Sequence, residues 1–304
     1  MGSRLNSIDH FLETPLPHEN VIAHATASLY VVATPIGNLR DISLRALDIL
    51  SAVDVIAAED TRNTRHLLDA HGITTRLVAL HQHNEQEAAQ KILALLRENK
   101  SVALVSDAGT PAVSDPGALC VQAVREAGFP VVPIPGANAA VAALSAAGMA
   151  ETGFLFAGFL PARSAGRKKI LQQLANLPQT LVFYEAPHRI VEFTQDCVAV
   201  FGDRRKIVFA RELTKLFEQF HACDLADALA WLQADVNHQR GEFVVLVQGA
   251  NAAPDDSAEG ARVLRLLLAE LPLKQAASLA AQITGAKRNA LYQLALELKA
   301  ENPE

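Results

Sequence analysis

The chain has 304 residues, of which half are apolar and 5% aromatic, and its formal net charge is −6. This length and apolar content allow two or three domains with mainly aliphatic cores. No apolar run in the sequence is long enough to span a bilayer. The three cysteines are widely spaced and form neither a metal-binding pattern nor a disulfide framework. We therefore expect a protein of the reducing cytoplasm with no membrane partner and no metal site.

The first 28 residues are mostly polar and show no hydrophobic periodicity. They also lack the apolar central region of a signal peptide. We therefore expect residues 1–28 to form a disordered leader that contributes nothing to the fold.

The next hundred residues alternate short strand patterns with helical ones. The predicted strands are residues 29–34, 53–58, 77–80, 101–105 and 131–134. Repeated strand–helix units predict an α/β domain with a mostly parallel sheet and helices on both faces. Ligands of such sheets bind at the carboxyl ends of the strands.

The stretch 106–117 reads SDAGTPAVSDPG and joins a predicted buried strand to a predicted helix. Asp107 comes just after the strand, and Gly109 allows the backbone to approach a ligand closely. Asp115 has the position of a helix N-cap, with Pro116 as the first helical residue. Two Asp, two Gly and two Pro exceed what a simple connection needs, so this loop is predicted to be a binding site.

Polar residues also follow other predicted strands, and each group of them allows two interpretations. Glu59, Asp60 and Arg62 suit acid–base or anchoring chemistry, but acids also favour a helix N-terminus. His81 and His83 suit a hydrogen-bonding loop better than a metal site, which lacks a third ligand. The first strand is followed by a single glycine, so the fingerprint of a dinucleotide-binding loop is missing.

The second half contains strand patterns joined by shorter links, which predict a mixed sheet. These patterns are residues 154–160, 180–184, 206–211, 216–222 and 241–248. Residues 152–184 contain no acid, so a polyanion-binding face is as well supported as the ordinary alternative, a solvated helix face. The basic residues of this stretch are Arg163, Arg167, Lys168 and Lys169.

A linker composition at 251–260 precedes three helical patterns. The last two patterns are separated by Thr284 and Gly285, which is typical of a helix-turn-helix. The basic excess here, including Lys287 and Arg288, fits nucleic-acid contact, and a packing or dimerisation module is the alternative. The predicted domains are residues 29–135, 136–250 and, after the linker, 261–304.

Seven motifs occur in a characteristic order: ATPIGNLRDISLRAL, AAEDTR, HNE, VSDAGTPAVSDPG, PGANA, FYEAPHR and GEFVV. Together they resemble the tetrapyrrole methylase superfamily over roughly residues 29–298. Within it the chain is similar to the family that methylates a ribose 2′-oxygen in small-subunit ribosomal RNA, on a cytidine of the decoding centre. The resemblance implies two α/β domains, a small C-terminal helical domain, S-adenosylmethionine bound between the α/β domains, and a homodimer.

The resemblance also implies which residues contact the cofactor. These residues are Pro35, Gly37, Asp107, Ala108, Gly109, Thr110, Asn138, Ala139, Tyr184 and Leu213. It does not carry over a catalytic base. A ribose hydroxyl needs a proton acceptor. The candidates are Glu59, Asp60, His83, Glu185 and His188.

We rank Glu59 and Asp60 first among these candidates, and we expect Arg62 and Arg189 to hold phosphates beside them. The predicted RNA-binding residues are Arg163, Arg167, Lys168, Lys169, Lys287 and Arg288. Only one Trp and three Tyr occur in the chain, so an aromatic pocket for base methylation is not expected.

Two other functions remain open. The same fold could methylate a tetrapyrrole, a corrinoid or a modified amino-acid side chain. A non-catalytic RNA-binding assembly factor is the other alternative, and the intact SDAGTP loop is evidence against it. A nicotinamide-dependent oxidoreductase is disfavoured by the missing glycine fingerprint.

Overall fold

The computed structural model describes residues 27–80, 85–149, 153–250 and 256–301. Most of the predicted leader, His81, His83 and half of the predicted linker lie outside the described residues. The chain divides into two compact units, with the boundary after Gln248, and the segment Asn176–Pro178 joins the second unit. Among the described residues, no helix has both the length and the apolar character needed to cross a membrane.

The first unit begins with a five-stranded parallel sheet in the order β3-β2-β4-β1-β5. This arrangement confirms the predicted parallel sheet. Its strands are β1 (Leu29–Val32), β2 (Val55–Ala58), β3 (Arg76–Ala79), β4 (Val102–Val105) and β5 (Val131–Ile134). The central strand, β4, is buried along its whole length, as both faces of a parallel sheet are covered.

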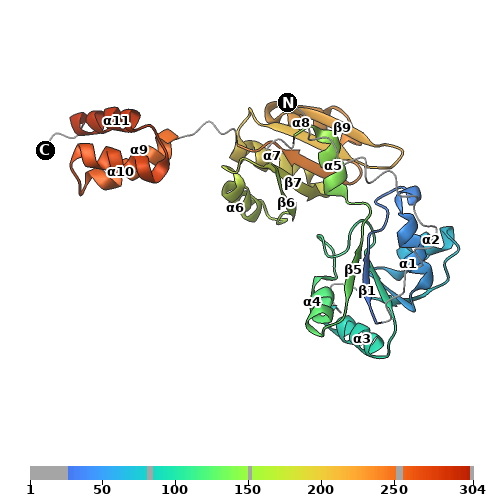
Figure 1. The fold of residues 1–304 in the computed structure, drawn as a ribbon. Helices are drawn as coiled ribbons and strands as arrows, with labels where there is room; N and C mark the ends of the chain where they lie inside the picture. The colour runs from blue at the N-terminus through green and yellow to red at the C-terminus, as the bar shows by residue number, and fades with distance from the viewer. Residues whose placement is uncertain (1–26, 81–84, 150–152, 251–255, 302–304) are drawn as a thin grey trace, which may run out of the picture. The chain divides into compact units, whose positions relative to one another are not determined.

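Helices cover both faces of this sheet (Figure 1). They are α1 (Leu44–Ala52), α2 (Thr61–Ala70), α3 (Glu85–Arg97) and α4 (Ala118–Glu126). Strand residues alternate between the two cores, as the period of a strand requires. Val32 and Ile56 pack with α1 and α2, whereas Ala57 and Leu104 pack with α3 and α4.

The second sheet of this unit has the order β6-β7-β10-β8-β9. Its strands are β6 (Phe154–Phe159), β7 (Thr180–Glu185), β8 (Lys206–Arg211), β9 (Gln219–Asp224) and β10 (Phe243–Val247). The pair β6–β7 is parallel and all other pairs are antiparallel, which confirms the predicted mixed sheet. The fourth predicted strand, placed at 216–222, starts later because Leu216 lies in the exposed turn before β9.

Helices also cover both faces of the second sheet. Helix α5 (Ala139–Ala147) packs its Ala140 and Ala143 against Val182 and Val244 of one face. Helices α7 (Ile190–Phe201) and α8 (Leu225–Ala234) place Phe193 and Trp231 against aromatic side chains of the other face. The basic stretch forms α6 (Ser164–Leu174), which packs against α7.

The second unit consists of α9 (Asp256–Leu268), α10 (Leu273–Thr284) and α11 (Arg288–Glu301). They share one small core, which includes Leu264, Ala277 and Leu291. Helix α10 ends at Gly285, whose φ of 78° is the left-handed conformation that favours glycine at a helix C-terminus.

The N-terminus of α4 is capped differently from the prediction. The helix begins at Ala118, its N-cap position is Gly117 with φ 128°, and no side chain of its own caps it. Instead, Glu85 of α3 accepts hydrogen bonds from the backbone N–H groups of Gly117 (2.9 Å) and Leu119 (2.8 Å). The predicted capping role of Asp115 is therefore wrong, and Asp115 is left free for another role.

We expect Glu85→Ala to lower the free energy of unfolding by about 1–2 kcal/mol, because two helix N–H groups lose a charged acceptor. Glu87→Ala on the same helix is the control, since Glu87 makes only an exposed ion pair with Lys91, for which about 0.5 kcal/mol or less is expected. Urea titration of both variants measures the difference. Equal losses would show that Glu85 contributes no more than a surface charge.

Candidate active site

The loop 106–117 leaves the central strand β4 and is held by backbone contacts on both sides. Thr34, just after β1, exchanges two hydrogen bonds with Gly109, at 2.8 and 3.0 Å. The Thr110 hydroxyl donates to the carbonyl of Ala137, which precedes α5, at 3.1 Å. The turns after β1, β4 and β5 are thereby joined at one edge of the sheet, the edge predicted to bind ligands.

Asp107 connects this loop to the end of β2. Its carboxylate accepts hydrogen bonds from the Asp60 N–H and from the Asn63 side-chain amide, each at 3.0 Å. Its own N–H donates to Glu59 at 3.3 Å. Both carboxylate oxygens thus accept from the N-terminus of α2, which fixes the exposed Asp107 side chain against that helix.

Asp60 is committed to its own helix. It caps α2 by accepting from the Arg62 N–H at 2.8 Å, and it forms a two-pronged ion pair with the Arg62 guanidinium at 2.7 and 3.1 Å. The hydrogen bonds from Arg62 lower the pKa of Asp60 to about 2. A carboxylate with so low a pKa is a weak proton acceptor, while the Arg62 side chain is largely exposed.

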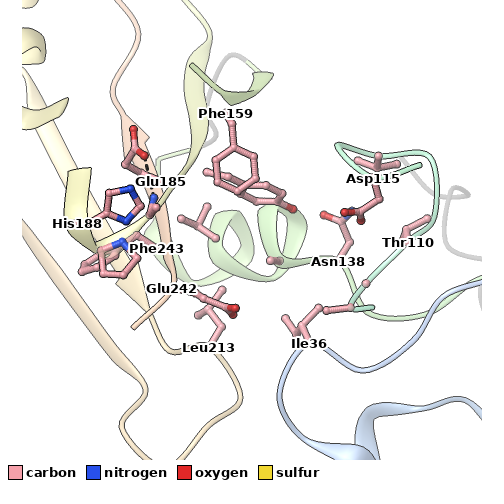
Figure 2. Close-up of a pocket in the computed structure, with 18 residues that line it drawn as sticks. Ile36, Thr110, Asp115, Asn138, Phe159, Glu185, His188, Leu213, Glu242 and Phe243 are labelled. Atoms are coloured by element: carbon pink, nitrogen blue, oxygen red, sulfur yellow. Dashed lines mark hydrogen bonds between the residues drawn. The ribbon is translucent and has the colours of Figure 1, made fainter. Parts of the chain in front are cut away.

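A cavity of about 500 Å³ lies between this loop edge and the second sheet (Figure 2). Two segments of the parallel-sheet half, together with the start of α5, form one wall. These residues are Ile36, Ala108, Gly109, Thr110, Val113, Asp115, Asn138 and Ala139. The mixed sheet and its connections supply the other wall, with Phe159, Tyr184, Glu185, Ala186, Pro187, His188, Leu213, Glu242, Phe243 and Val244.

Seven of the ten predicted cofactor residues line this cavity: Ala108, Gly109, Thr110, Asn138, Ala139, Tyr184 and Leu213. Pro35, Gly37 and Asp107 are not among the lining residues. Gly37 has a packing role instead, because a Cβ there would lie 2.6 Å from the Lys215 side chain and 2.8 Å from the Thr214 hydroxyl. The close approach of these two segments requires a glycine.

Tyr184 joins the two walls. Its hydroxyl accepts a hydrogen bond from the Ala140 N–H in the first turn of α5, at 3.2 Å. Its ring meets those of Phe156 and Phe159 edge to face, with centroids 4.9 and 5.6 Å apart. Burial raises the pKa of the Tyr184 hydroxyl.

Glu185 and Arg189 neutralise each other beneath the cavity. The buried Glu185 carboxylate accepts from the Ala186 N–H at 2.8 Å and lies 3.1 Å from the Arg189 guanidinium. Arg189 also donates to the Leu160 carbonyl at 2.7 Å. Burial raises the pKa of Glu185. The predicted phosphate contact of Arg189 is therefore not favoured, since its guanidinium is used within the protein.

Asp115 lines the cavity, although its sequence position predicted a helix N-cap. It is half-buried, and it faces the cavity from the same wall as Thr110 and Asn138 (Figure 2). Burial and the negative charges of Glu59 and Asp107 raise its pKa to about 6, against the opposing effect of the Ser106 hydroxyl. No ion pair of Asp115 is found in the described part of the chain.

Glu59, by contrast, lies behind the cavity. It does not line the cavity, and it accepts the Asp107 N–H. Burial raises its pKa, with smaller contributions from the negative charges of Asp107 and Asp60. His188 lines the cavity from the second sheet, on the side of Glu185 (Figure 2).

The predicted RNA-binding residues differ in exposure. Arg163, Lys169, Lys287 and Arg288 are exposed, and Lys168 lies 3.4 Å from the Asp196 carboxylate. Arg167 is fully buried and donates to Asp196 at 2.6 Å. It has no surface to offer a phosphate, so we remove it from the predicted RNA-binding set.

Two family profiles match the chain. The family described as Tetrapyrrole (Corrin/Porphyrin) Methylases matches residues 28–229. The family described as RsmI C-terminal HTH domain matches residues 254–299. The protein named Ribosomal RNA small subunit methyltransferase I from Escherichia coli O157:H7 is 53% identical over 275 residues, which cover 90% of this chain and 96% of that protein. Its namesake from Pseudomonas aeruginosa PAO1 is 51% identical over 90% of this chain and 98% of its own length.

Solved structures share the fold at lower identity. A uroporphyrin-III C-methyltransferase from Thermus thermophilus, complexed with S-adenyl homocysteine, aligns with a TM-score of 0.53 at 21% identity, covering 73% of this chain and 97% of that chain. A cobalt precorrin-4 methyltransferase aligns with a TM-score of 0.54 at 15% identity, covering 73% of this chain and 95% of its own. These structures support the fold alone.

We expect Asp115→Asn to stabilise the protein near neutral pH. Because the pKa is raised in the folded state, the folded protein binds more protons than the unfolded one between the ordinary value of 3.8 and about 6. The folded protein therefore loses stability as the pH rises through this window. After allowance for partial exposure, the variant should gain about 1 kcal/mol at about pH 7.5 and almost nothing at about pH 4.

Urea titration at both pH values measures this gain. Asp48→Asn on α1 is the control, since Asp48 is an exposed carboxylate outside the cavity. A loss of stability at the higher pH would show that the charge of Asp115 is satisfied within the fold.

Proposed function

Because the chain belongs to the tetrapyrrole methylase family and groups with the ribosomal RNA small subunit methyltransferases I, we propose that it methylates small-subunit ribosomal RNA. The methyl donor is S-adenosylmethionine. Relatives that share half of their residues with this chain match it across both the α/β unit and the C-terminal helices. The structural observation that best supports this proposal is the cavity, which is lined by the SDAGTP loop on one side and by the second sheet on the other.

The cavity fits this donor in size and charge. Its volume of about 500 Å³ lies within the roughly 300–1,000 Å³ typical of small-molecule sites. Of its eighteen lining residues none is Lys or Arg. Three are carboxylates, of which Glu185 is paired with Arg189 and Glu242 with Lys215, whereas Asp115 has no cationic partner among the described residues. This lining suits the positive sulfonium and ammonium groups of S-adenosylmethionine. When bound, the donor supplies a methyl group that its positive sulfur has already activated.

The small residues Ala108, Gly109 and Ala139 leave room for the donor against the backbone of the first wall. Gly109 has φ 80°, which a residue with a side chain adopts only with strain. Thr110 and Asn138 provide polar atoms beside these residues. We therefore assign donor binding to residues 108–110 of the loop and to the start of α5.

We propose Asp115 as the proton acceptor for the nucleophilic hydroxyl, in place of Glu59 and Asp60. Asp115 lines the cavity and has no cationic partner among the described residues, and its pKa of about 6 suits proton transfer near neutral pH. Asp60 is held by Arg62 at a pKa of about 2, and Glu59 is held by the Asp107 N–H. Glu185 is neutralised by Arg189.

The nucleophile we propose is the ribose 2′-oxygen of a cytidine in the decoding centre. A carboxylate that accepts a proton supports a hydroxyl nucleophile. The scarcity of aromatic residues no longer supports ribose over base, because Phe159, Tyr184 and Phe243 line the cavity. Asp115 and the resemblance to the family are therefore the two observations that support the ribose 2′-oxygen as the nucleophile.

RNA contact is assigned to two exposed basic sets, Arg163 and Lys169 beside α6, and Lys287 and Arg288 at the start of α11. Lys168 is a secondary candidate because it forms an ion pair with Asp196.

We further propose a cytoplasmic homodimer. Exposed apolar side chains in the turn before β9, Leu216 at 90% and Phe217 at 69%, support an interface there.

A tetrapyrrole or corrinoid substrate is the alternative within this fold. The aligned uroporphyrin and precorrin enzymes are only 15–21% identical to this chain, and they cover 73% of it. The C-terminal helices with their basic residues favour RNA. A non-catalytic assembly factor is the other alternative, and it would bind subunits without transferring a methyl group.

Incubation with labelled S-adenosylmethionine and purified small ribosomal subunits should place the label in the ribosomal RNA. Mass spectrometry of the nucleosides should then identify 2′-O-methylcytidine. A label on a base would contradict the ribose assignment, and tight subunit binding without any label would favour the assembly factor.

For Asp115 we expect the single-turnover rate to rise with pH, to reach half its maximum near the pKa of about 6, and to level off above it. Asp115→Asn should lower the rate about 100-fold or more and abolish this rise, because the amide accepts no proton. S-adenosylhomocysteine affinity, measured by calorimetry, should change little.

Glu59→Gln is the matched control, since it removes the neighbouring carboxylate but leaves the proposed acceptor. It should keep the rise and move it to lower pH, because one negative charge near Asp115 is lost. If Asp115→Asn keeps the rise and Glu59→Gln abolishes it, Glu59 is the proton acceptor.

A further inference from the structure

Strand β6 contains an irregularity beside the cavity. Its pairing with β7 matches Phe156 to Val182, Gly158 to Phe183 and Phe159 to Tyr184, so that one residue of β6 has no partner. This is a β-bulge, a feature that re-aims side chains next to functional sites.

The bulge changes which side chains share a face. In a regular strand, residues three apart point to opposite faces of the sheet. Because of the extra residue, Phe156 and Phe159 instead lie on the same face, and both rings contact Tyr184 at interplanar angles of 67° and 65°. Phe159 is thereby directed into the cavity (Figure 2).

The bulge lies against the loop 106–117. Gly158 has φ 61°, and a Cβ there would lie 2.7 Å from the hydroxyl oxygen of Ser114. The bulge therefore abuts the loop that carries Asp115, one residue after Ser114. Phe159 and Asp115 each lie one residue from this close approach.

Phe159 is 57% exposed although it lines the cavity, whereas Phe156 and Tyr184 are partly buried. Tyr184 supports the ring at an angle of 65° and does not stack on it. An aromatic ring held in this way offers a rigid apolar surface to a ligand. A ligand with a flat face can stack on such a surface.

On the premise of the proposed function, we propose that Phe159 is the platform on which the base of the target nucleotide stacks. Strand β6 leads within a few residues to the exposed Arg163 and then to Lys169 of α6. These exposed cations follow Phe159 in the chain and are our candidates for contact with the phosphates that flank the stacked base. Stacking on an aromatic ring holds a base that has left its helix and tolerates any base, so it positions the ribose without reading sequence.

Steady-state methylation of small subunits by Phe159 variants tests this inference. Phe159→Ala should raise the KM for subunits about 5- to 100-fold, the range expected for one base–aromatic stack. Phe159→Trp should stay within about 3-fold of the unmodified protein, because indole also stacks. Phe159→Leu should resemble the alanine variant, since it restores apolar volume without a ring.

Phe154→Ala is the matched control, because Phe154 lies on the same strand with 46% exposure and does not line the cavity. It should leave the KM unchanged. Calorimetry with S-adenosylhomocysteine should give the same affinity for all variants, which also shows that they are folded. In Phe159→Trp, binding of subunits should quench the added tryptophan fluorescence, whether or not methyl transfer occurs.

Three results would overturn the platform. A leucine variant with the KM of the unmodified protein would reduce Phe159 to apolar packing. A loss of S-adenosylhomocysteine affinity in the alanine variant would assign the ring to the adenine of the donor. Unquenched fluorescence with bound subunits would show that no base reaches the ring. Failure of the unmodified protein to methylate subunits would instead contradict the proposed function. The fluorescence measurement would still show whether a base stacks on residue 159.

Discussion

The site depends on the capping of α4 by a residue from another helix. Glu85 accepts the N–H groups of Gly117 and Leu119, so the helix needs no acceptor from its own loop. Asp115, which has the sequence position of a cap, can therefore face the cavity, where it has no cationic partner among the described residues. The loop 106–117 adopts unusual backbone conformations, with positive φ at Gly109, Ala112, Ser114 and Gly117. Such strain persists only where surrounding contacts fix the chain. The Thr34–Gly109 pair provides one of these contacts.

Three carboxylates then lie near one another at the same sheet edge, and the fold treats each differently. Asp107 receives two hydrogen bonds from the start of α2, and Glu59 receives one from Asp107. Asp115 has no cationic partner among the described residues, and burial with its acidic neighbours raises its pKa to about 6. Groups placed in this way reduce stability, and they are common at sites that transfer protons. The raised pKa that lowers stability near neutral pH is thus the same property that supports the proposed role of Asp115 as proton acceptor.

Local and periodic signals in the sequence were enough to predict much of the fold. Apolar runs at strand spacing and helical stripes between them predict the parallel sheet, and the position of SDAGTP after a buried strand predicts the site edge. The misses involve partners that are distant in sequence. Asp115 looked like a cap because Glu85, thirty residues earlier, is not visible as its replacement. Arg167 looked exposed within an acid-free stretch, yet its partner Asp196 lies on the next helix.

The second wall of the cavity was the least predictable part. Tyr184 and Leu213 were expected there only through the resemblance, and Phe159 was not expected at all. A bulge leaves no periodic signal, because it shifts side chains by a single residue. Its only trace in the sequence is Gly158, a glycine inside a strand pattern.

The two walls also share their contacts, which limits how either can change. Ser114 meets Gly158 of the bulge, and the Tyr184 hydroxyl accepts from the first turn of α5. Both contacts join a residue next to proposed chemistry to a residue that shapes the aromatic wall. A displacement of the loop would therefore move Asp115 and disturb the support of Phe159 together. The loop that carries the proposed proton acceptor and the strand that carries the proposed base platform are therefore in contact, which favours a fixed placement of the ribose relative to the carboxylate.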